Sequence, residues 1–110
     1  MIAKTLLDYL DQTLDVPGVM EAPDQTSDYV LIDQTGSSRT NHIITTTFAI
    51  QSYGDTLYEA MVLNDAVKDA MVGFAELGNV TRVDLQTDYN YTNTATKQYR
   101  WQAVYLITHY

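Results

Sequence analysis

The last segment of the chain is apolar on both alternating sides, and this pattern restricts the fold more than any other. Large side chains occupy odd and even positions alike: Trp101, Tyr105 and Ile107 on one side, and Val104, Leu106 and Tyr110 on the other. Successive side chains of a strand point to opposite faces of a sheet, so both faces of this strand need cover. Two interpretations stay open. Either the strand is central and a loop closes its second face, or that face is an apolar patch of the kind that marks an interaction surface.

Two earlier segments are rich in β-branched residues and predict a hairpin. The run 29-YVLID-33 is short and apolar, and 42-HIITTTFAIQSY-53 is dominated by Ile and Thr. Between them, 34-QTGSSRTN-41 collects Gly, Ser, Thr and Asn, which is typical of an exposed loop. We therefore expect two paired strands joined by a loop at 34–41.

A fourth strand is predicted at 80–91, where apolar and polar positions alternate. One face would carry Val83, Leu85, Thr87, Tyr89 and Tyr91, and the other Arg82, Asp84, Gln86, Asp88 and Asn90. Such alternation is typical of a strand with one buried and one solvated face. If this strand pairs with the last one across the loop 92–98, we expect it to bring together Val83, Leu85 and Tyr89 with Trp101, Tyr105 and Ile107.

Two segments have the apolar spacing of amphipathic helices. The first covers residues 2–14 and is followed by the helix-stopping pair Pro–Gly at 17–18. The second begins after Thr56, which has capping-box spacing with Glu59. Gly–Asn at 78–79 is expected to close this second helix.

The resulting order of elements is helix, strand, strand, helix, strand, strand. Residues 18–27, between the first helix and the first strand, are expected to be a connection, and residues 1–110 a single domain. Short connections favour antiparallel neighbours. We therefore predict an α+β fold of αββαββ order, with one largely antiparallel four-stranded sheet and two helices packed on one face.

Composition excludes several classes of function. The formal net charge is −8, from 14 Asp and Glu against 6 Lys and Arg, so the chain should repel phosphate backbones and not bind nucleic acid directly. The absence of cysteine excludes disulfides, thiol nucleophiles and zinc–thiolate sites. No apolar run is as long as a membrane span, and aspartates interrupt the N-terminal segment too early for a signal peptide. We expect a soluble protein made in the cytoplasm.

Three groups of residues could carry catalysis or metal chemistry: His42 and His109; Asp8, Asp11 and Asp15; and Ser37 and Ser38. The histidines fit partly buried positions on strands better than a metal pair. The aspartates fit a solvated helix face, because helical spacing lacks the geometry of a calcium loop. The serines lack a nucleophile-elbow pattern. We therefore expect no enzyme, no metal site and no cofactor.

The order of elements at this length resembles the tail terminator proteins of long-tailed bacteriophages, also described as minor capsid or head–tail joining proteins. Three segments carry the resemblance: 5-TLLDYLDQTL-14, 55-DTLYEAMVLNDAVKDAM-71 and 97-KQYRWQAVYLITHY-110. It implies a structural virion protein without an active site, made in the host cytoplasm and located in the tail or neck. It also implies a homo-hexameric ring that ends the tail tube, with the tail tube protein and the head connector or head-completion protein as partners.

A closed ring requires two different, complementary surfaces on each subunit. The last strand could supply one of them, because Tyr and Trp often anchor interfaces. The subunit-interface candidates are Tyr99, Trp101, Val104, Leu106 and Tyr110. The candidates for contact with the tube or the connector lie in the predicted loops: Ser37, Ser38, Arg39 and Lys97.

Two other classes of function stay open. One is a small ligand- or partner-binding module of the same αββαββ order, which would have a pocket between helices and sheet. The other is a small enzyme, which would need titratable groups that converge in one cleft. A pocket or such a cleft in the folded chain would favour one of these classes over the ring.

Overall fold

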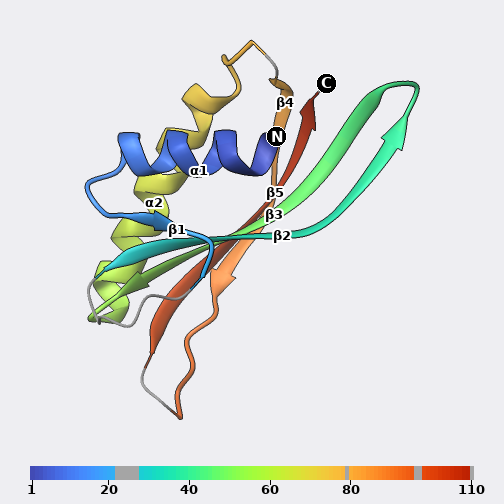
Figure 1. Ribbon diagram of the computed structural model, residues 1–110. Helices are drawn as coiled ribbons and strands as arrows, with labels where there is room; N and C mark the ends of the chain where they lie inside the picture. The colour runs from blue at the N-terminus through green and yellow to red at the C-terminus, as the bar shows by residue number, and fades with distance from the viewer. Residues whose placement is uncertain (22–27, 79, 96–97, 110) are drawn as a thin grey trace.

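Two helices and five strands make up the fold (Figure 1). The computed structural model describes residues 1–21, 28–78, 80–95 and 98–109. In chain order the elements are α1 (Ile2–Thr13), β1 (Gly18–Val19), β2 (Tyr29–Thr40), β3 (Ile43–Gly54), α2 (Leu57–Phe74), β4 (Val80–Asn90) and β5 (Tyr99–His109). The predicted α+β class and both predicted helices are confirmed.

The strands form one mixed sheet in the order β1-β2-β3-β5-β4. β2 and β3 are antiparallel neighbours, and β5 is antiparallel to both β3 and β4. The final strand therefore lies inside the sheet, with a hydrogen-bonded partner along each edge. This pairing satisfies both edges of the strand, whereas its two apolar faces depend on other parts of the fold for cover.

The prediction of four antiparallel strands is wrong in one respect, since β1 adds a short parallel strand at one edge. Gly18 and Val19 pair with Val30 and Leu31, and the Val30 amide donates to the Pro17 carbonyl at 3.0 Å. The chain leaves α1 beside the edge of β2, whose backbone groups need partners. This return path turns the start of the predicted connection at 18–27 into a strand; residues 22–27 lie outside the described residues.

The predicted loop at 34–41 is also wrong, because β2 continues through it to Thr40. The strand shifts register between Gln34 and Gly36 and then pairs with β3 as far as Ile43. Only Asn41 and His42 turn the chain, with φ of 51° and 69°, values that suit a tight two-residue hairpin turn. His42 thus lies in a turn and not on a strand. The small polar residues indicated exposure correctly, but hairpin pairing satisfies their backbone groups.

This hairpin extends beyond the part of the sheet that the helices cover. Every side chain from Asp33 to Ile43 is exposed, and Figure 1 shows the hairpin projecting at the upper right, away from both helices. We call residues 34–43 the arm. Since the arm has no core beneath it, its backbone pairing alone keeps it extended.

α2 begins at the predicted cap. The Glu59 amide donates to the Thr56 hydroxyl oxygen at 3.1 Å, and the Glu59 carboxylate accepts from the Asp55 amide at 3.2 Å. Glu59 therefore reaches the residue before the cap, one position earlier than in the usual reciprocal capping pair. These bonds fix the point at which β3 turns into α2.

α2 ends at Phe74, earlier than the predicted closure at 78–79. The amides of Glu76 and Leu77 donate to the carbonyls of Gly73 and Phe74, three residues back. This tighter pattern ends the α-helical bonding before Gly78 is reached. Asn79 lies outside the described residues.

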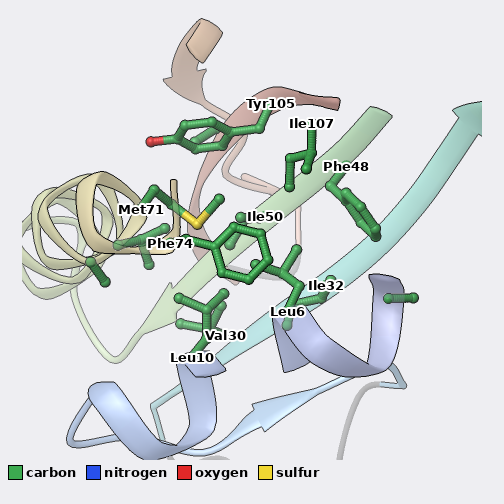
Figure 2. Packing of buried hydrophobic residues seen from close by; sticks show 14 of the residues in the cluster. Leu6, Leu10, Val30, Ile32, Phe48, Ile50, Met71, Phe74, Tyr105 and Ile107 are labelled. Atoms are coloured by element: carbon green, nitrogen blue, oxygen red, sulfur yellow. The ribbon is translucent and has the colours of Figure 1, made fainter. Parts of the chain in front are cut away.

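Both helices pack on the same face of the sheet, as predicted. Figure 2 shows side chains from α1, α2 and the sheet converging in one apolar cluster. Its members include Leu6 and Leu10 from α1, Met71 and Phe74 from α2, and Val30, Ile32, Phe48, Ile50, Tyr105 and Ile107 from the sheet. The sheet face opposite this core is called the free face below.

The predicted alternation of β4 fails halfway along the strand. Leu85 pairs with Tyr105 as expected, but a register shift between Leu85 and Thr87 places Thr87 opposite Val104. Because side chains alternate with a period of two, one extra residue moves every later side chain to the other face. Tyr89, expected beside Trp101, lies instead on the free face opposite Gln102, and Asp88 faces α2.

Among the glycines of the chain, Gly54 makes the closest approach to backbone atoms of another segment. A Cβ at Gly54 would lie 2.7 Å from the Ala60 amide nitrogen, whereas one at Gly36 meets nothing within 4 Å. We expect Gly54→Ala to lower the free energy of unfolding by about 1–3 kcal/mol through overpacking. Gly36→Ala is the control and should change it by less than about 0.5 kcal/mol. Equal shifts of the two variants in urea unfolding would contradict this account of Gly54.

Candidate interaction surfaces

A chain of side-chain hydrogen bonds crosses the free face of the sheet. The Tyr53 hydroxyl donates to Gln51 at 2.7 Å, and the Gln51 amide donates to Gln102 at 2.9 Å. The Gln102 amide then donates to the Tyr89 hydroxyl oxygen. These hydrogen bonds link β3, β5 and β4, and both glutamines are buried. Buried amides are tolerated there because each has a partner.

Aromatic rings and Arg100 close the same end of the free face. The rings of Tyr29 and Tyr53 stack with centroids 4.4 Å apart. Arg100 donates to the Tyr53 hydroxyl oxygen at 2.9 Å, and its guanidinium lies 4.4 Å from the centre of the Tyr91 ring. Burial and the neighbouring Tyr53 raise the pKa of Tyr29, which Arg100 partly offsets. The protein covers this end of the face with its own side chains.

Val104 and Leu106 lie farther along β5 on the free face, and both remain half-buried. They pair with Ala49 and Thr47 of β3, and Leu106 also pairs with Asp84 of β4. Within the described part of the chain, both helices lie on the other face. A small apolar patch flanked by threonine and aspartate therefore stays accessible at the centre of this face.

The other interface candidates of the last strand do not share that patch. Trp101 lies on the same face as the buried Ala103 and Tyr105, which confirms its predicted place on the core side. Tyr99, two residues earlier, has the same parity and pairs with Gly54. Tyr110 lies outside the described residues. The five candidates therefore do not form one surface, because two of them face the core side.

Asp88 anchors a polar cluster beneath α2 that the sequence did not predict. Its carboxylate accepts from the Lys68 ammonium and from the Asn64 amide, each at 2.9 Å. The hydrogen bond from Lys68 is the main cause that lowers the pKa of Asp88, and Asn64 and Trp101 act in the same direction. The same bond raises the pKa of Lys68. The bulge in β4 turns Asp88 inward, and no pattern of residue types marks that bulge.

A groove of about 340 Å³ lies between the end of α1 and the first half of α2. Its lining is mainly apolar and consists of Leu14, Asp15, Val16, Asp28, Tyr58, Glu59, Val62, Leu63 and Ala66. We call its three acidic residues, Asp15, Asp28 and Glu59, the rim. Tyr58 and Val62 are 75% and 49% exposed. Large apolar side chains this exposed are suited to contact with a partner. The helical spacing of residues 55–71 indicates which side chains lie on each side of α2. The sequence alone did not show that Tyr58 and Val62 remain exposed beside a groove.

Three carboxylates at the start of α2 approach one another closely. Oxygens of Asp28, Asp55 and Glu59 lie within 4.8 Å of each other. Two of these groups accept a hydrogen bond from the Asp55 amide, Asp28 at 3.2 Å and Glu59 at 3.2 Å. Acidic groups are favourable at a helix N-terminus. Capping therefore accounts for this cluster.

The aspartates of the first helix have structural roles. Asp8 forms an ion pair with Lys4 at 3.0 Å, and Asp11 accepts from the Gly18 amide at 3.0 Å. Asp15 lines the groove. Asp8 and Asp11 therefore have different partners, and Asp15 lies beyond the end of α1.

The histidines and serines are not brought together into a catalytic arrangement. His109 is buried on β5, as expected for a strand histidine, and its Nε2 lies 2.8 Å from the Thr46 hydroxyl. His42 is exposed in the turn of the arm. Ser37 and Ser38 are exposed on the arm, opposite Thr46 and Thr45.

Of the predicted contact-loop residues, three lie together on the arm. Ser37, Ser38 and Arg39 are consecutive on β2 and exposed. Lys97 lies outside the described residues. The contact residues that can be placed are therefore on a paired hairpin and not on a loop.

Comparison with known proteins adds no family. No protein-family model and no curated protein matches this chain. Among the described residues, no helix is long and apolar enough to cross a membrane.

The Asp88 cluster makes a prediction about pH. The lowered pKa of Asp88 means that its contribution to stability is present at neutral pH and is lost as the pH falls through that pKa, below about 4. The raised pKa of Lys68 keeps the partner charged until the pH exceeds about 10.5. Asp88→Asn should therefore be less stable than the wild type at pH 7, and the difference should shrink on acidification.

Urea unfolding between pH 2.5 and pH 8 measures this difference. Asp69→Asn removes one exposed carboxylate from α2 and is the matched control for net charge. A gap between wild type and Asp88→Asn that stays constant down to the lowest pH would contradict the assigned role of the carboxylate.

Proposed function

We propose that this chain is a structural subunit that self-associates into a closed ring. The observation that carries the proposal is the accessible patch of Val104 and Leu106 at the centre of the free face, with both helices on the other face. Half-buried apolar side chains on a central strand lose their remaining contact with water when a second surface covers them. A second copy of the chain is the simplest source of such a surface.

The resemblance to tail terminator proteins gives this ring a role. In that role it ends the tail tube of a long-tailed bacteriophage and joins it to the head connector. The ring would be a homo-hexamer that contacts the tail tube protein on one side and the head connector or head-completion protein on the other. The protein would be made in the host cytoplasm and located in the tail or neck of the virion.

The charge of the chain is compatible with this role. A net charge of −8 discourages adhesion to a phosphate backbone. A ring through which DNA passes needs a wall to which DNA does not stick. The proposal includes no catalytic step. Asp8, Asp11 and His109 have hydrogen-bond or ion-pair partners, and Ser37, Ser38 and His42 lie exposed on the arm.

A small binding module is the second candidate, and the groove beside α2 favours it. The groove has a mainly apolar lining that includes the three carboxylates of the rim, and such concave sites suit small ligands. A module of this kind would stay monomeric or dimeric while it binds a ligand. The mass of the purified protein in solution therefore separates the two candidates.

Light scattering over a concentration series measures that mass. The ring predicts a species near six subunits, or a monomer that converts to it as concentration rises. A mass that stays at one or two subunits throughout would favour the binding module over the ring.

Substitutions on β5 should separate assembly from folding. Val104→Asp or Leu106→Asp places a charge on the half-buried free face, so each should weaken self-association by about tenfold or more while the monomer still folds. Trp101→Ala should instead lower the free energy of unfolding, because Trp101 lies on the core side and contacts Asp88.

Light scattering and urea unfolding of the same preparations test this contrast. If both aspartate variants unfold the isolated chain, the patch is part of the core and does not serve as an accessible contact surface.

A further inference from the structure

The arm differs in charge from the rest of the chain. Residues 34–43 contain Arg39 and no Asp or Glu, in a chain with a net charge of −8. Arg39 is exposed, and Ile43 at the end of the arm is 42% exposed. The arm therefore presents a cation and a branched apolar side chain to its surroundings.

The groove beside α2 has the complementary character. Asp15, Asp28 and Glu59 place negative charge on its rim, while Val62 and Leu63 contribute to its apolar lining. A guanidinium on the rim would meet carboxylates, and an isoleucine in the groove would meet aliphatic side chains. This match of charge and apolar surface favours the arm as the occupant.

One chain cannot place its own arm in its own groove. β3 runs from Ile43 in the arm to Gly54, whose Cα lies against the first turn of α2 beside Glu59. At about 3.3 Å per residue, these twelve residues span about 36 Å. Figure 1 shows the arm and the start of α2 at opposite ends of the sheet. The arm must therefore come from a second copy.

The free edge of β4 is a poorer acceptor for the arm. β4 shifts register twice against β5, and it carries the exposed ion pair between Arg82 and Asp84. Bulges and charges on an edge strand discourage the addition of another strand. The groove is thus the better complement to the arm.

We infer that the arm of one copy binds in the groove of the next, with Arg39 at the carboxylate rim and Ile43 against the apolar lining. This inference rests on the proposed self-association and supplies the two different, complementary surfaces that a closed ring requires. Arm and groove are different surfaces, so the contact is head-to-tail. Every open row of subunits therefore leaves one arm unbound at one end and one groove empty at the other. Only a closed ring places every arm in a groove.

A mixing experiment with two variants tests the inference. The arm variant combines Arg39→Asp with Ile43→Asp, and the groove variant is Val62→Arg; all three positions are exposed, so both variants should fold. Each variant alone should associate at least tenfold more weakly than the wild type. An equimolar mixture should form a dimer and nothing larger, since the intact arm of the groove variant fits only the intact groove of the arm variant.

Matched controls change side chains of the same kind elsewhere. Lys4→Asp alters an exposed cation on α1, outside the arm, and Val72→Arg alters a residue that is 73% exposed on α2 and does not line the groove. Both should assemble as the wild type does. Light scattering gives the masses, and circular dichroism checks that each variant is folded.

The outcomes separate this inference from the proposed ring. If the arm and groove variants assemble like the wild type while Leu106→Asp does not, the arm contact is wrong and the ring remains. A mixture that stays monomeric also overturns the arm contact. If the wild type is itself monomeric up to about 1 mM, both the arm contact and unaided ring formation are wrong.

Discussion

The pairing of β5 along both of its edges is the constraint on which the rest of the structure depends. All eleven of its residues pair with β3 on one side, and the nine from Trp101 to His109 pair with β4 on the other. One of its faces supplies Tyr105 and Ile107 to the core beneath both helices. Burial raises the pKa of Tyr105 to about 12. With that face committed to the core, any further contact of β5 must use the free face.

β3 links the two surfaces proposed for the arm contact. It begins in the arm and ends at Gly54, against the first turn of α2. The Thr56 cap fixes the angle at which the helix begins. The arm and the groove are therefore held apart by a paired strand, and a head-to-tail contact between copies would have a defined geometry.

Local signals in the sequence predicted both helices, the cap of α2 and the two faces of β5. Each depends on neighbours a few residues away, such as Thr56 and Glu59. The extra strand at Gly18, the paired arm and the inward turn of Asp88 depend instead on partners far along the chain. Residue types do not predict such long-range pairing. A bulge in β4, for example, moves the later side chains of the strand to the opposite face of the sheet without any change in composition.

The candidate surfaces show the same division between features that local patterns predict and features that depend on distant parts of the chain. Val104 and Leu106 followed from alternation alone, whereas the groove needed the path of the chain after α1. The sequence did not predict that glutamines and tyrosines hydrogen-bond to one another on the free face. These side chains limit the part of that face that a partner can contact. They cover one end of it and leave only Val104 and Leu106 of the described interface candidates accessible there. A charged contact such as Arg39 with the groove rim would fix the orientation of a partner, because electrostatic complementarity sets register more effectively than apolar area does.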